Sequence, residues 1–148
     1  MLLFTRRMAR LLLLLLFLFA SSEVVHAVPS RAYEEGQVWA YHTRPGDEGS
    51  LMKIQKIERS DAFPDGPIYH ISVIDFRVED PRLSTELPHA PVSRATLDQS
   101  VTNLAETMRE FPSVEEGIAE WKAHEGGVWT ITVAKIIDIV AGVTLPAR

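Results

Sequence analysis

The sequence predicts an α+β fold in which a curved antiparallel β-sheet, a meander plus one C-terminal strand, is covered by two or three helices. Two observations support this prediction. Runs with strand-like alternation, rich in β-branched and aromatic residues, fill the first half of the chain after residue 34. Stretches with helical periodicity follow them. Strands followed by helices are typical of α+β domains, whereas alternating strands and helices are typical of parallel sheets.

The meander is predicted from three runs separated by short polar turns. In "LMKIQKIE", Met52 and Ile54 share one face while Ile57 lies on the other, and this change of phase indicates a β-bulge or a strong twist. The turn "FPDG" follows, where Pro64 presets the backbone and Gly66 closes the turn. The predicted strands are 37–43, 51–59 and 68–78.

A crossing loop and a first helix are predicted next. The segment "EDPRLSTELPHAPV" contains three prolines and little periodicity, which favours a loop. An apolar stripe then predicts an amphipathic helix over 94–109. Ser93 is the expected N-cap, with Thr96 and Gln99 as an alternative capping box. The stripe consists of Leu97, Val101, Leu104 and Met108.

The remaining elements are a second helix, a strand and one segment whose secondary structure the sequence leaves open. Ser113 and Glu116 have capping-box spacing at the start of a helix predicted over 113–124, which ends before two glycines. The sheet is expected to gain a strand near 128–132. Periodicity leaves open whether 133–141 is a helix or a strand. One core is expected to contain Trp39, Ile54, Ile71, Val73, Leu97, Val101, Leu104, Ile118, Trp121 and Ile136.

The N-terminus has the three-part pattern of a secretory signal peptide. A basic region precedes the apolar run "LLLLLLFLFA", and small residues follow at the positions that a signal peptidase reads. The run is about half the length that a transmembrane helix needs. We therefore expect residues 1–27 to be a signal peptide cleaved between Ala27 and Val28, with 28–33 a linker and 34–148 one domain. General secretion is favoured over twin-arginine export, because Ala9 replaces the bulky residue preferred after "TRRM".

Composition narrows the classes of function. Removing residues 1–27 takes three of the 15 basic and one of the 20 acidic residues, which leaves a formal charge of −7. An acidic chain without a Lys/Arg stripe is not expected to bind nucleic acid, and no membrane span is expected after cleavage. The chain has no cysteine, which excludes disulfides, thiol catalysis and cysteine–zinc sites. A periplasmic or secreted location is expected.

Several segments together resemble a family of small uncharacterised bacterial proteins. They are "GQVWAYHTRPGDEGS", "YHISV", "LPHAPVS", "SVEEGIAEW" and "GGVWTITVAKII". The resemblance covers nearly all of 34–141 and implies a single bacterial domain. It implies no activity, cofactor or catalytic residue.

Recognised catalytic and phosphate-binding motifs do not occur in the sequence. Neighbouring strands could bring His42 and His70 together, with His89 above them, and three imidazoles could hold zinc or copper. Their spacing is not that of a metal motif, so we expect neither a metal nor a cofactor.

Two polar segments are candidate ligand sites. Arg44, Asp47 and Glu48 crowd a loop tip, where they could bind a polar ligand or form a solvated hairpin end. In "LPHAP", two prolines stiffen the chain around His89. This stiff arm could present His89 to a ligand or form a packed corner, and the corner is favoured. If the chain has a ligand site, we expect it between 44–49 and 87–92, near His70.

Two classes of function remain open from the sequence. The first is a non-catalytic binding or interaction module of the cell envelope, with an unknown protein or a small polar ligand as its partner. The second is a small hydrolase or metal-dependent enzyme that uses His42, His70 and His89. Imidazoles within about 5 Å of one another in a cleft would favour the enzyme.

Overall fold

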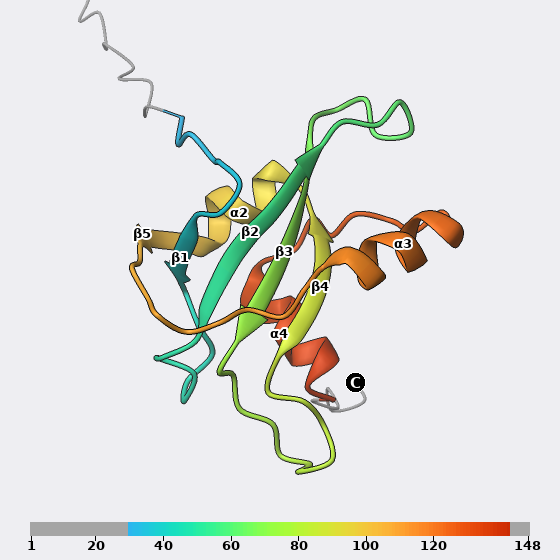
Figure 1. Cartoon of the computed structure of the whole chain (residues 1–148). Helices are drawn as coiled ribbons and strands as arrows, with labels where there is room; N and C mark the ends of the chain where they lie inside the picture. The colour runs from blue at the N-terminus through green and yellow to red at the C-terminus, as the bar shows by residue number, and fades with distance from the viewer. Residues whose placement is uncertain (1–29, 143–148) are drawn as a thin grey trace, which may run out of the picture. The chain divides into compact units, whose positions relative to one another are not determined.

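The computed structural model describes residues 30–142, and the expected signal peptide with its cleavage site at Ala27 and Val28 lies outside them. The described chain contains a five-stranded antiparallel sheet in the order β4-β3-β2-β1-β5, accompanied by three helices (Figure 1). The predicted α+β class is therefore confirmed. The strands are β1 (Val38–Tyr41), β2 (Leu51–Glu58), β3 (Ile68–Ile74), β4 (Leu87–Val92) and β5 (Val101–Leu104).

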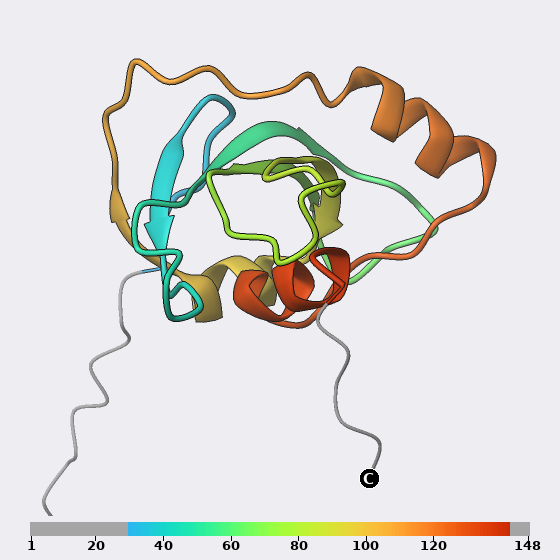
Figure 2. The same cartoon turned by 90° about the horizontal axis from the view of Figure 1, so that it is seen from below.

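The helices lie on both sides of the sheet. They are α2 (Arg94–Ser100), α3 (Glu115–Ala123) and α4 (Val133–Val140). Figure 2 shows α2 and α4 together against one face, while the segment 105–114 crosses the opposite side and leads into α3. The segment 133–141, left open by its periodicity, is therefore mostly helical. We call the side of the sheet nearer to α3 the α3 face.

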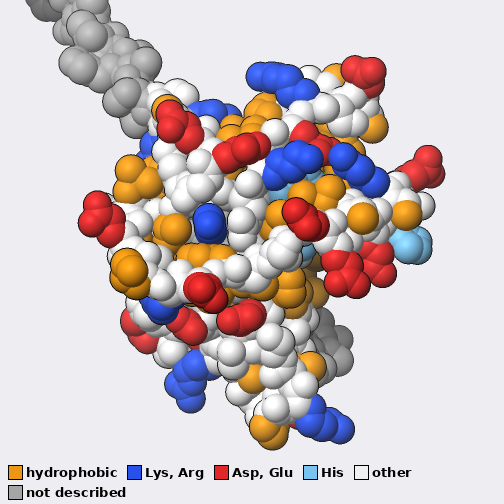
Figure 3. All heavy atoms as spheres, viewed as in Figure 1, with side chains coloured by type: hydrophobic (Ala, Val, Ile, Leu, Met, Phe, Trp, Pro, Cys, Tyr) orange, Lys and Arg blue, Asp and Glu red, His pale blue; other side chains and the backbone are white. Residues whose placement is uncertain are grey.

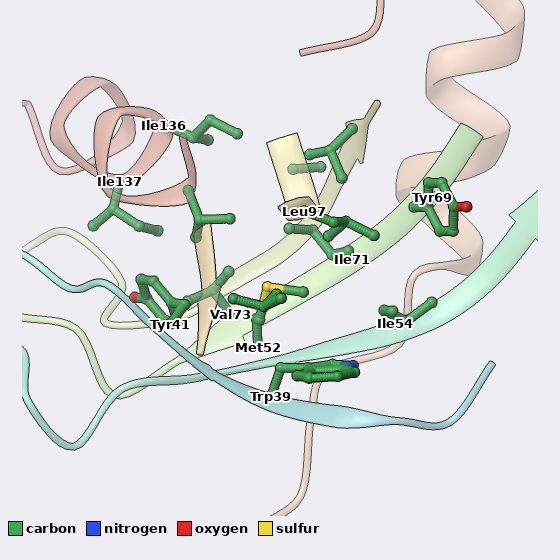
Figure 4. Close-up of a cluster of buried hydrophobic side chains, with 14 of the residues drawn as sticks. Trp39, Tyr41, Met52, Ile54, Tyr69, Ile71, Val73, Leu97, Ile136 and Ile137 are labelled. Carbon is green, nitrogen blue, oxygen red and sulfur yellow. The ribbon is translucent and has the colours of Figure 1, made fainter. Parts of the chain in front are cut away.

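The main core lies between the sheet and the pair α2 and α4 (Figure 4). Alternate residues of β3 point into it, and Leu97 of α2 and Ile136 of α4 close it from the other side. Tyr33, within the expected linker, also packs into this core, and its hydroxyl donates to Asp98 Oδ1 at 2.8 Å. The buried members are Tyr33, Trp39, Tyr41, Met52, Ile54, Tyr69, Ile71, Val73, Phe76, Ala90, Val92, Leu97, Val101, Val133, Ile136, Ile137 and Ala141.

The expected bulge in β2 is confirmed. The pairing of β2 with β3 shifts register between Ile54 and Lys56. Met52 and Ile54 belong to the core before the shift, and Ile57 packs against it afterwards. A bulge inserts one residue and so reverses which side chains face the core. Glu58 is consequently turned to the α3 face.

The expected crossing loop contains a strand. Its last part, Leu87–Val92, pairs with β3 as β4. Proline cannot donate a ladder hydrogen bond and is tolerated mainly in edge strands. β4 is the edge of the sheet, so Pro88 and Pro91 fit there. The stiff arm around His89 was predicted from the two prolines, but its pairing with β3 was not.

The helix predicted over 94–109 is much shorter. Ser93 is the N-cap as expected, and its Oγ accepts a hydrogen bond from the Thr96 N–H at 3.1 Å. The helix ends at Ser100 because Val101 turns extended and pairs with Tyr41 as the start of β5. Leu104 is 61% exposed, so its assignment to the core was wrong.

Two further core assignments and one strand also differ from expectation. Near 128–132, Trp129 forms only an isolated bridge with Val92, so no full strand develops there. Ile118 is buried but lies outside the main cluster, and Trp121 is only partly buried. Both belong to α3, which lies on the other side of the sheet from that cluster.

Candidate functional site

Two histidines meet on the α3 face. His70 lies in β3 and His89 in the edge strand β4. Their rings stack with centroids 5.1 Å apart, and His70 Nδ1 lies 2.8 Å from His89 Nε2, a hydrogen-bond distance. His70 is completely buried, whereas His89 is half-buried. Both histidines are among the candidate site residues predicted from the sequence.

A carboxylate extends this pair to the surface. Glu58 Oε2 lies 3.6 Å from His70 Nε2, which is the buried side-chain nitrogen without a hydrogen bond among the described residues. The same oxygen lies 3.2 Å from Lys122 Nζ on α3 and 3.8 Å from Lys56 Nζ on β2. Glu58, His70 and His89 thus form one continuous polar chain, which we call the Glu58–His70–His89 chain.

Electrostatics determines how protons are arranged in this chain. If His70 carried its proton on Nδ1, the lone pair of Nε2 would point toward the Glu58 carboxylate, and the two would repel. If His70 carries it on Nε2, the N–H points at the carboxylate, and Nδ1 accepts a hydrogen bond from His89 Nε2–H. The second arrangement is favoured. It leaves the Nδ1 of His89 with a free lone pair.

The pKa values agree with neutral imidazoles at pH 7. Burial, followed by the repulsion of a charged His89, lowers the pKa of His70 to about 4, although Glu58 opposes this. Burial also lowers the pKa of His89. Burial would raise the pKa of the Glu58 carboxyl, but Lys122 and the other nearby positive charges lower it overall. At neutral pH the Glu58 carboxylate therefore faces an uncharged His70 ring, which is hydrogen-bonded in turn to an uncharged His89 ring.

Two glycines allow close packing around the pair, Gly117 against His89 and Gly126 against Trp121. A Cβ on Gly117 would lie only 2.4 Å from the Cβ of His89, so no larger residue fits without a shift. A Cβ on Gly126 would lie 2.1 Å from Cδ1 of Trp121. Trp121 presents its ring to His70 at 5.2 Å in a T-shaped contact, and its indole N–H donates to Gly127 O. The close fit fixes both rings against α3.

Two hollows share Trp121 in their linings. The Glu58 hollow has a volume of about 460 Å³ and includes Glu58, Phe63, Trp121, Lys122 and Gly126 among its lining residues. The His89 hollow has a volume of about 400 Å³ and is lined by Pro88, His89, Gly117, Glu120, Trp121 and His124. Figure 3 shows acidic side chains gathered at the right of the molecule, over α3, next to a histidine. The Glu58–His70–His89 chain connects the two hollows through the interior.

The loop 44–49 forms a separate cluster. Arg44 Nε donates to Asp47 Oδ2 at 2.7 Å, and Arg44 Nη2 donates to Arg77 O at 2.6 Å. Asp47 is buried and also accepts from the Arg77 N–H, while Glu48 accepts from the Gly46 N–H. These contacts join the β1–β2 loop to the segment after β3. Arg44 and Asp47 therefore stabilise the fold at this end of the sheet.

The five candidate site residues thus fall into two groups. Along β3, Ile74 lies four positions after His70, and it pairs with Leu51 just after the loop. At about 3.3 Å per residue this is roughly 13 Å. His42 is exposed at the end of β1, where its backbone N–H donates to Ser100 O. Within residues 30–142, no group of three or more His, Cys, Asp or Glu side chains is placed to hold a metal ion.

Sequence reasoning missed Glu58, Trp121 and Lys122 as site residues. The change of phase in β2 was a signal for Glu58, since the bulge it indicates turns Glu58 toward His70. The partners on α3 gave no such signal, because their approach depends on how α3 packs over the sheet.

No protein-family model matches this chain, and comparisons with curated proteins and with solved structures find no match either. Within the described part of the chain, no helix combines the length and the apolar character needed to cross a membrane.

Proposed function

We propose that this chain is an exported binding module of the bacterial cell envelope and that it binds its partner at the two hollows beside Trp121. One observation carries the proposal: a completely buried histidine, His70, is joined to the half-buried His89, which lines one of these hollows. Burying polar groups costs free energy, and His70 Nε2 is without a hydrogen bond among the described residues. Such a cost is typical of functional sites.

The N-terminal pattern supports export, and the composition narrows the kinds of partner that the module binds. The N-terminal pattern is that of a secretory signal peptide, and the excess of acidic residues disfavours nucleic acid and anionic membrane surfaces. Purified exported protein should begin at Val28 when its N-terminus is sequenced. A chain that retains residues 1–27 would contradict export by cleavage.

The binding site is tested by capture from envelope extract. The purified protein is immobilised, and the material it retains is compared for the wild type, His89→Gln and His42→Gln, with metal content measured on the same samples. Glutamine can still donate a hydrogen bond to His70, so His89→Gln should keep a nearly unchanged melting temperature. We expect His89→Gln to lose the retained partner and His42→Gln to keep it. Equal retention by both variants would refute a site at His89.

A small hydrolase is the second candidate, and the imidazole contact favours it. His70 and His89 approach within 2.8 Å, and a carboxylate orients the pair, as in many acid–base sites. A hydroxyl nucleophile is missing from the contacts: Ser72 Oγ donates to Pro88 O, and within residues 30–142 no hydroxyl is hydrogen-bonded to either imidazole. Hydrolysis of 4-nitrophenyl acetate that is lost in His89→Gln and retained in His42→Gln would establish this alternative.

A further inference from the structure

The His89 hollow presents hydrogen-bond acceptors. The proton arrangement of the Glu58–His70–His89 chain uses His89 Nε2 for the hydrogen bond to His70 and leaves a lone pair on His89 Nδ1. Nδ1 lies beside Gly117, which also lines the hollow. Glu120, an exposed residue of α3, adds a carboxylate to the lining. Trp121 adds an aromatic ring whose own N–H is already donated to Gly127 O. None of the described lining residues is Lys or Arg.

A cation with several N–H donors is complementary to such a lining. An ammonium group carries three donors and no acceptor, so it can donate to an imidazole lone pair and to a carboxylate at once. Phe63 stacks on the Trp121 ring, so the complementarity rests on the imidazole and the carboxylate. An anion or a carboxylate would meet Glu120 and a lone pair, and both would repel it.

We propose that the His89 hollow binds a primary ammonium group, with His89 Nδ1 and the Glu120 carboxylate as its two acceptors. This inference rests on the proposed binding function and names its ligand class. The ammonium group could belong to a free amine or to the lysine side chain of a partner. Glu58 takes part indirectly, because it holds His70 in the form that leaves His89 Nδ1 unprotonated.

Binding should weaken at acid pH, since a protonated His89 loses its lone pair and repels a cation. The groups that set this protonation come from three elements. His70 contacts His89 directly from β3, and Glu120 and His124 approach from α3. Glu58 and Lys56 of β2 and Lys122 of α3 act through His70.

The test is an NMR titration of the purified exported protein with n-butylammonium chloride. We expect shifts of the resonances of His89, Gly117 and Trp121, and none with the neutral isostere butan-1-ol. Glu120→Gln should weaken binding at least fivefold. Glu116→Gln, which removes the same charge from α3 outside the hollow, should not. The residual binding of Glu120→Gln should still decrease with falling pH, because His89 remains.

Equal shifts with butan-1-ol, or equal effects of Glu120→Gln and Glu116→Gln, would overturn the ammonium assignment. Nα-acetyl-lysine methylamide distinguishes the two sources: tighter binding than butylammonium assigns a lysine side chain, and equal binding assigns a free amine. If butylammonium fails to bind while His89→Gln still loses its partner from envelope extract, only the ligand class is wrong. If both experiments fail, the proposed function falls as well.

Discussion

Replacing Gly117 by alanine tests the close packing of α3 on the histidine pair. The new Cβ would lie 2.4 Å from the Cβ of His89 and 2.8 Å from its Nδ1. These atoms belong to the start of a side chain anchored in β4, so α3 has to move. Overpacking of this kind costs about 1–3 kcal/mol. Alanine offsets about 1 kcal/mol of that cost through its higher helix propensity.

We therefore expect Gly117→Ala to lower the free energy of unfolding by about 1 kcal/mol, measured by urea denaturation. Ala119→Gly, at an exposed position of the same helix, measures the propensity contribution separately. The imidazole resonances of His70 and His89 should shift in Gly117→Ala and not in Ala119→Gly. A Gly117→Ala variant that is more stable by the full propensity value, with unchanged imidazole resonances, would refute the contact between α3 and His89.

Leu97→Ala should lower the free energy of unfolding by about 2–5 kcal/mol because Leu97 is completely buried, whereas Leu104→Ala, at an exposed position, should leave it almost unchanged. Equal losses for the two variants in urea denaturation would contradict the described end of α2. Asp47→Asn should lower the free energy of unfolding by about 2 kcal/mol, because it removes the charge of a buried carboxylate that accepts a hydrogen bond from Arg44. An unchanged melting temperature would refute the structural role of Asp47. The pKa of His70 is lowered from 6.5 to about 4 in the folded protein, so the unfolded chain binds this proton more readily. The free energy of unfolding should therefore have its full value above pH 6.5 and decrease by about 3 kcal/mol as the pH falls to 4. A pH dependence that is the same in His70→Asn would contradict this.

The sequence predicted the fold class because the local signals agree with the packing. The alternation in β2 and β3, the bulge at Ile54 and the N-cap at Ser93 are each encoded within a few residues. The end of α2 is not encoded locally. The stripe from Leu97 to Leu104 has helical spacing, but Val101 pairs with Tyr41 of β1, and this non-local pairing overrides the periodicity.

The candidate site was predictable only in part for the same reason. His70 and His89 were identified as candidate residues, with His89 on a loop above the strand of His70, and it is the pairing of β3 with β4 that brings them together. The expected crossing loop hid this pairing, because the two prolines in "LPHAP" are as compatible with a loop as with an edge strand. Lys122 and Trp121 join the site through the packing of α3, which local sequence does not specify.

The proton arrangement of the Glu58–His70–His89 chain is the central claim, and long-range ¹H–¹⁵N NMR of the imidazole rings at pH 7 measures it most directly. We predict that both histidines are neutral and carry their protons on Nε2, with His89 Nδ1 unprotonated. Glu58→Gln should change the His70 resonances, whereas Glu116→Gln should leave them unchanged. A His70 ring protonated on Nδ1, or a doubly protonated His70 at pH 7, would contradict the account.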